Sequence, residues 1–191
     1  MHFPAARQNK GISGVTALCG RFLRDTRAIG AVEFALIFPV MLTIYFGVAE
    51  MTNALIVQRR VTMIAQTAAD LVAQAASVTN SDMTDIMAAS TAIMQPFSTG
   101  PIKIKISSVV ADSTNKTKVA WSDAKNTTAR TVGSTVTLPS GLTSAGTSVI
   151  YAEVSYAYVS PVLGQVLASG IAMGDQAYLK PRRSVTVARV P

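Results

Sequence analysis

The chain is poor in the residues that build most catalytic and metal centres. Its 191 residues include one cysteine, Cys19, and one histidine, His2. A single cysteine excludes an intramolecular disulfide bond and a cluster of thiolate ligands. A single histidine beside the N-terminal methionine excludes a Ser-His-Asp triad, a Cys–His pair and a multi-histidine metal site from the rest of the chain. We therefore expect no metal ion and no cofactor.

Motifs of nucleotide-binding and hydrolytic enzymes are also missing. The sequence has no P-loop, no glycine-rich dinucleotide loop, and no HExxH or GxSxG pattern. The alternative of an anchored hydrolase would depend on a cleft that gathers Asp112, Asp123 and Glu153, and we expect the fold to scatter them. Asp112 and Asp123 lie in polar sequence typical of turns. We interpret the protein as non-enzymatic, with no small-molecule substrate.

Positive charge is concentrated near the N-terminus. The formal net charge is +7, from 17 basic and 10 acidic residues. Only Asp25 opposes the basic residues that precede Ala28, which are Arg7, Lys10, Arg21, Arg24 and Arg27. The remaining cations are scattered rather than arranged in a stripe, so we expect no binding to nucleic acid.

A long apolar run follows this basic segment. The residues from Phe34 to Ala49 carry no charge, and extension back to Ala28 adds only Glu33 as an interruption. About 22 residues are enough to span ~30 Å of hydrocarbon. The run is longer than the 7–15-residue apolar core of a cleaved secretory signal peptide, which is the alternative.

The flanking charges predict the orientation of the membrane helix. Basic residues stay on the cytoplasmic side, so the C-terminal bulk is expected to be exported. We predict three parts: a basic cytoplasmic leader at 1–28, a transmembrane helix at 29–52 and an exported domain at 53–191.

The exported part begins as a continuation of the same helix. Apolar residues recur at spacings of three and four, at Val57, Val61, Ile64, Ala68, Leu71 and Ala75. This spacing gives one apolar face, so we predict that the helix runs to about Ser77 and packs on the domain that follows. A second helix is predicted after Ser81, the expected N-cap, with an apolar stripe from Met83 to Phe97.

Beyond Pro101 the apolar period changes from about 3.6 to two. Alternation predicts a strand at 102–107 with a partner at 118–121, a short strand at 134–138 and a strong strand at 148–159. A helical turn is predicted at 161–167, followed by strand-like segments at 176–180 and 184–189. The order of elements predicts an α+β fold: a long N-terminal helix, a second short helix and an antiparallel sheet.

Two segments near the N-terminus and one near the C-terminus carry a family resemblance. The N-terminal segments are Ala31-Val32-Glu33-Phe34-Ala35-Leu36-Ile37-Phe38-Pro39-Val40 and the stretch from Phe46 to Glu50, and the C-terminal one is Tyr178-Leu179-Lys180-Pro181-Arg182-Arg183-Ser184. With these segments the chain resembles the TadE-like pseudopilins. These proteins belong to the tight-adherence (Flp) branch of type IV pili. The resemblance implies a pilin-like α+β fold on a membrane stalk.

The resemblance also implies roles for individual residues. A membrane prepilin peptidase would cut between Ala28 and Ile29, which places Glu33 at the fifth position of the mature chain. The residue before the cut is usually glycine, so either the peptidase accepts Ala28 or the protein keeps its leader. Glu33, with its neighbour Phe34, is assigned to assembly, because its carboxylate can neutralise the new α-ammonium group.

Three further positions are candidates for contacts. Glu50 matches a possible second acidic position, and Arg182 and Arg183 are possible contacts for an acidic partner. The predicted function is that of a minor pilin or pseudopilin that supports pilus initiation or assembly and surface attachment. Expected partners are membrane lipid, the prepilin peptidase, pilin subunits and the inner-membrane assembly platform. The alternative is an uncleaved, permanently anchored scaffold or binding protein of the same apparatus.

Overall fold

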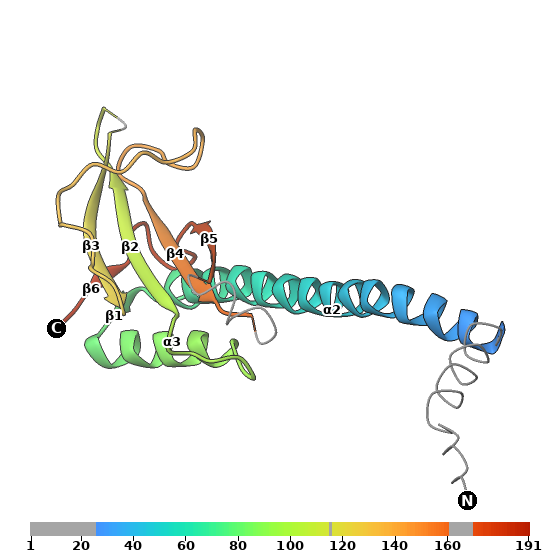
Figure 1. Ribbon diagram of the computed structural model, residues 1–191. Coiled ribbons are helices and arrows are strands. Elements are labelled where there is room, and N and C mark those ends of the chain that lie inside the picture. The colour runs from blue at the N-terminus through green and yellow to red at the C-terminus, as the bar shows by residue number, and fades with distance from the viewer. Residues whose placement is uncertain (1–25, 115, 161–169) are drawn as a thin grey trace, which may run out of the picture. The chain divides into compact units, whose positions relative to one another are not determined.

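A computed structural model describes residues 26–114, 116–160 and 170–191 of the chain. The leader up to Asp25 and the helical turn predicted at 161–167 lie outside these residues. Within these described residues, two helices and six strands follow one another (Figure 1): α2 Thr26–Ala73, β1 Ser77–Val78, α3 Asn80–Ala92, β2 Lys103–Ala111, β3 Thr117–Lys125, β4 Ser148–Tyr158, β5 Ile171–Leu179 and β6 Ala188–Arg189. The predicted α+β class is confirmed.

Helix α2 runs through the boundary between two compact units, which falls between Ala49 and Glu50. In the first unit every large apolar side chain from Ile29 to Val48 is exposed. A helix that is apolar around its whole circumference and uncovered by its own chain has the character of a membrane span. This N-terminal helix is long and apolar enough to cross a bilayer, which fits a single-pass membrane protein.

The second unit begins with the amphipathic part of α2. Val57, Val61, Ile64 and Ala68 are fully buried, as their spacing predicts, whereas neighbouring Met63 is 53% exposed. The buried stripe packs on isoleucine, valine and tyrosine side chains of the sheet, and methionines of α3 complete the same cluster. Burying a side chain of this size stabilises a fold by about 1.5–3 kcal/mol, so this stripe is a main source of the unit's stability.

The sheet is antiparallel with strand order β3-β2-β4-β5 (Figure 1). Because side chains alternate along a strand, one face carries Ile104 and Val154, which pair in register and belong to the core beneath α2. The opposite face carries a smaller apolar cluster around Val109 and Tyr151, with Val136 from the connection between β3 and β4 packed on it. The sheet is therefore covered by α2 and α3 on one face and partly by a loop on the other.

Several predicted boundaries differ from the structure. Helix α2 ends at Ala73 instead of Ser77, because Ala73 accepts a hydrogen bond from the backbone of Arg182 (2.8 Å) and the following residues form β1. The N-cap of α3 is Thr79 instead of Ser81, since Thr79 and Asp82 form a reciprocal capping box.

The predicted strands are present with changed lengths. Strands β2 and β3 extend the predicted hairpin to Lys103–Ala111 and Thr117–Lys125, and β4 lies where expected. The segment predicted as a strand at 134–138 contributes only an isolated bridge between Thr135 and Lys118. β5 starts earlier than predicted, at Ile171, and only Ala188–Arg189 of the last predicted strand is extended and paired.

Candidate functional site

The candidate assembly residues lie on the membrane-spanning part of α2. Ala28 and Ile29 are both inside the helix, and Ile29 is 57% exposed. Glu33 follows Ile29 by four residues, which places both on one side of the helix. Phe34 is exposed and its ring contacts that of Phe38, with 5.2 Å between ring centroids. The candidate cleavage position and Glu33 thus lie within one helical turn.

Glu33 is exposed on this apolar helix, and within the described part of the chain no cation pairs with it. A carboxylate carried into hydrocarbon costs a few kcal/mol unless a donor or cation meets it. The described chain therefore leaves this group available for a partner outside it.

Glu50 lies in a different environment, where the second unit begins. Only 8% of its surface is exposed, although it is an acidic residue next to an apolar span. Its Oε1 accepts a hydrogen bond of 2.6 Å from the hydroxyl of Tyr158, at the end of β4, whereas its buried Oε2 has no partner. Glu50 thus ties the helix to the sheet through a single side-chain hydrogen bond.

Tyr158, the hydrogen-bond partner of the candidate residue Glu50, is a residue that sequence reasoning missed. Burial and the hydrogen bond to Glu50 raise the pKa of its hydroxyl well above the ordinary value for tyrosine. The only signal in the sequence was an aromatic residue at the end of a strong strand, and its partner lies 108 residues away. Periodicity does not show such distant pairs.

The two candidate arginines differ in their contacts. Arg182 forms an ion pair with Asp70 of α2, with 2.6 Å between Nη2 and Oδ1, and its side chain is 60% exposed. Arg183 is exposed and has no ion-pair or hydrogen-bond partner among residues 26–114, 116–160 and 170–191. Arg183 is therefore the freer of the two cations for a partner contact.

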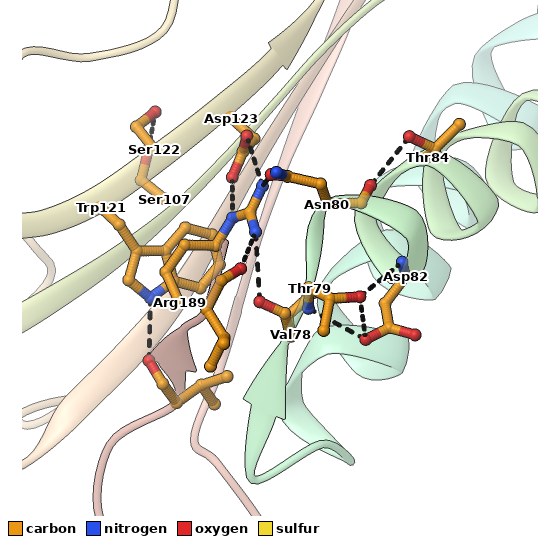
Figure 2. A network of polar contacts seen from close by, with 12 residues as sticks. Val78, Thr79, Asn80, Asp82, Thr84, Ser107, Trp121, Ser122, Asp123 and Arg189 are labelled. Carbon is orange, nitrogen blue, oxygen red and sulfur yellow. Dashed lines mark hydrogen bonds and ion pairs between the residues drawn. The ribbon is translucent and has the colours of Figure 1, made fainter.

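A third arginine, which the sequence did not single out, forms a larger network (Figure 2). Arg189 of β6 pairs with Asp123 of β3 at 2.8 Å and donates to Asn80 Oδ1 at 2.5 Å and to the carbonyl of Val78 at 3.2 Å. Beside it, the indole N–H of Trp121 donates to the carbonyl of Val187 at 2.8 Å. β6 also pairs in parallel with β1. The segment around β6 is thus fastened to β3, β1 and the start of α3.

The three carboxylates of the hydrolase alternative are not gathered. Asp123 pairs in register with Ile106 of the helix-covered face, whereas Glu153 pairs with Lys105 on the opposite face. These two carboxylates bind different arginines: Asp123 pairs with Arg189, and Glu153 pairs with Arg130, both at 2.8 Å. The carboxylate of Asp112 accepts hydrogen bonds within its own turn, which lowers its pKa. Within the described residues no group of three metal-ligating side chains is present either.

Comparison with protein families agrees with the resemblance seen in the sequence. The family model described as TadE-like protein matches residues 29–70. This range contains both Glu33 and Glu50 and ends three residues before α2 does. The match is consistent with a TadE-like protein of the tight-adherence system, whose family is not an enzyme family. Searches of curated proteins and of solved structures gave no match to this chain.

Proposed function

We propose that this TadE-like chain is a minor pilin or pseudopilin that supports initiation or assembly of a tight-adherence pilus and attachment to surfaces, and that it is not an enzyme. The observation that supports the proposal most directly is the exposed, unpaired Glu33 on an apolar helix inside the family match at 29–70. The protein would be stored in the inner membrane through α2, with its N-terminus cytoplasmic and its sheet periplasmic.

Glu33 would act by neutralising a new N-terminus. Cleavage between Ala28 and Ile29 would create an α-ammonium group, with an ordinary pKa of about 8, four residues before the carboxylate. The cation could belong to the same chain or to the neighbouring subunit. Because desolvation offsets much of the attraction in a low dielectric, the expected contribution is to the register of packed helices more than to net stability.

The exposed side chains of α2 favour the same function. Phe34, Leu36 and Ile37 are each more than half exposed, so this part of the helix presents an apolar surface on more than one side. Lipid would cover this surface in the membrane, and helices of pilin subunits would cover it in a fibre. The prepilin peptidase and the inner-membrane assembly platform are the other expected partners.

The N-terminus of the protein extracted from membranes tests the processing step. We expect Edman sequencing or intact mass to give Ile29 as the first residue, in a peptidase-dependent manner. A protein that still begins at Met1 would favour the second candidate function, that of a permanently anchored scaffold of the same apparatus. The observation in favour of this second candidate is that Ala28 stands where glycine is usual before the cleavage position.

Variants of Glu33 test the assembly step. We expect Glu33→Ala and Glu33→Gln to insert into the membrane at wild-type levels but to reduce fibre output at least tenfold, because neither can neutralise an N-terminal cation. Asp85→Ala is the matched control, since Asp85 is an exposed carboxylate of α3. Fibre output in the Glu33 variants equal to that of the control would remove the assembly role.

A further inference from the structure

A polar groove lies on the face of the sheet opposite the α2 core. Its volume is about 490 Å³, and it is lined by Lys103, Lys105, Thr127, Glu153, Val154, Ser155, Gly174, Asp175 and Gln176. The side chain of Val154 belongs to the core on the other face. The side chains that lie on the outer face of the sheet here are therefore polar.

The floor of the groove is built from small residues. Ser155 pairs in register with Lys103 on one side and with Gly174 on the other. A Cβ atom at Gly174 would lie 3.3 Å from the carbonyl oxygen of Val154, which is a tight contact. The small residues leave room above β4 and β5 for a ligand.

The charges of the groove leave two cations without partners. Among the described residues, neither Lys103 nor Lys105 has an ion pair or a hydrogen bond from its ammonium group. The acidic neighbours already have partners. Glu153 binds Arg130. Asp175, which pairs in register with Val154 of the core face, accepts hydrogen bonds from the Thr62 hydroxyl and from the backbone N–H of Gln176. Among the charged groups that line the groove, the two lysines are therefore the ones that have no partner.

The same face of the sheet carries a stack of rings beyond the residues that line the groove. Tyr151 and Tyr178 stack with 4.7 Å between ring centroids and 9° between planes, and the guanidinium of Arg130 lies 5.1 Å from the centroid of Tyr151. The hydroxyl of Tyr178 donates to Oε1 of Gln176 at 2.7 Å. This bond fixes the amide of Gln176 and leaves its N–H groups as donors toward the groove.

We propose that this groove binds an anionic oligosaccharide, a chain of sugars that carries carboxylate groups. The two ammonium groups would meet the carboxylates, and the amide and hydroxyl groups of Gln176, Ser155 and Thr127 would hydrogen-bond to sugar hydroxyls. A peptide is disfavoured, because peptide grooves rely on apolar pockets for alternate side chains, and the side chains on this face of the groove are polar. The proposal concerns the sheet alone and does not depend on pilus assembly.

Binding by the purified full-length chain in zwitterionic detergent tests the proposal. The probes are oligogalacturonate, the uncharged oligogalactose of the same length and poly-L-glutamate, measured by calorimetry at 50 mM salt. Lys103→Gln/Lys105→Gln is the test variant, and Lys116→Gln/Lys118→Gln is the control with the same change in charge on exposed lysines at the other end of the sheet. Gln176→Ala removes a hydrogen-bonding group without changing charge.

We expect oligogalacturonate to bind the wild type and the control variant within twofold of each other, and the test variant at least tenfold more weakly. Binding should weaken as salt is raised, and Gln176→Ala should bind severalfold more weakly. Equal loss in both double variants, or tighter binding of poly-L-glutamate than of oligogalacturonate, would overturn the proposal. So would a failure of the wild type to bind any sugar probe, while the pilus assays of Glu33 would stand unaffected.

Discussion

The network around Arg189 predicts a large effect from one substitution. Arg189→Gln removes the ion pair with Asp123 and the hydrogen bonds to Asn80 and to the Val78 carbonyl. The side chains of Arg189 and Asp123 are only 19% and 28% exposed, so water replaces the lost partner poorly. Hydrogen bonds to charged groups contribute about 1.5–3 kcal/mol, and we expect the free energy of unfolding to fall by about 2–3 kcal/mol.

The ion pair of Arg182 with Asp70 is the matched control. It joins the same residue types, but the arginine side chain is 60% exposed. Exposed pairs contribute about 0–1 kcal/mol, so Arg182→Gln should change stability little. The two variants lose the same charge, which separates the effect of burial and network geometry from the effect of net charge.

Fluorescence of Trp121 during urea unfolding is the appropriate measurement. It is the only tryptophan of the chain, and its indole N–H binds the Val187 carbonyl two residues before Arg189. A loss of about 2–3 kcal/mol corresponds to a thermal midpoint lower by roughly 4–12 °C. Equal destabilisation by Arg189→Gln and Arg182→Gln, or a loss below about 0.5 kcal/mol in Arg189→Gln, would refute the reasoning.

Two further predictions concern the core and the helix–sheet contact. Ile64→Ala should destabilise the second unit by about 2–5 kcal/mol in urea unfolding, because Ile64 is fully buried. Met63→Ala is the control and should change the free energy of unfolding by no more than about 0.5 kcal/mol, because Met63 is exposed. Equal effects of the two substitutions would contradict the assigned helix face. Burial and the Glu50 hydrogen bond raise the pKa of Tyr158, so the unfolded chain loses this proton first and the free energy of unfolding should fall as pH rises above about 10. Urea midpoints between pH 9 and 11 should fall less steeply in Tyr158→Phe, and an unchanged slope would argue against this linkage.

The sequence predicted the parts of the fold that depend on local periodicity. The stripe of Val57, Val61, Ile64 and Ala68 is buried because a spacing of three and four places these side chains on one helix face. The alternation after Pro101 likewise predicted β2, because one face of that strand is covered by the helix.

Features that join distant residues could not be predicted in this way. The helical pattern extends to Ala75, but hydrogen bonding between Ala73 and Arg182 and pairing of Ser77 with Ala188 end the helix earlier. Tyr158 and Arg189 were missed because their partners are 108 and 66 residues away in the chain. Glu33 was recognisable because a charge in an apolar run is visible without any knowledge of distant neighbours.

The pairing of β1 with β6 has a consequence for folding during synthesis. Val78 leaves the ribosome 111 residues before Arg189, which donates a hydrogen bond to its carbonyl. The nascent chain therefore exposes unpaired backbone groups of β1 until β6 has been synthesised. Non-local closure of this kind slows folding, so a chaperone that holds the unfinished chain would protect the β1 segment most.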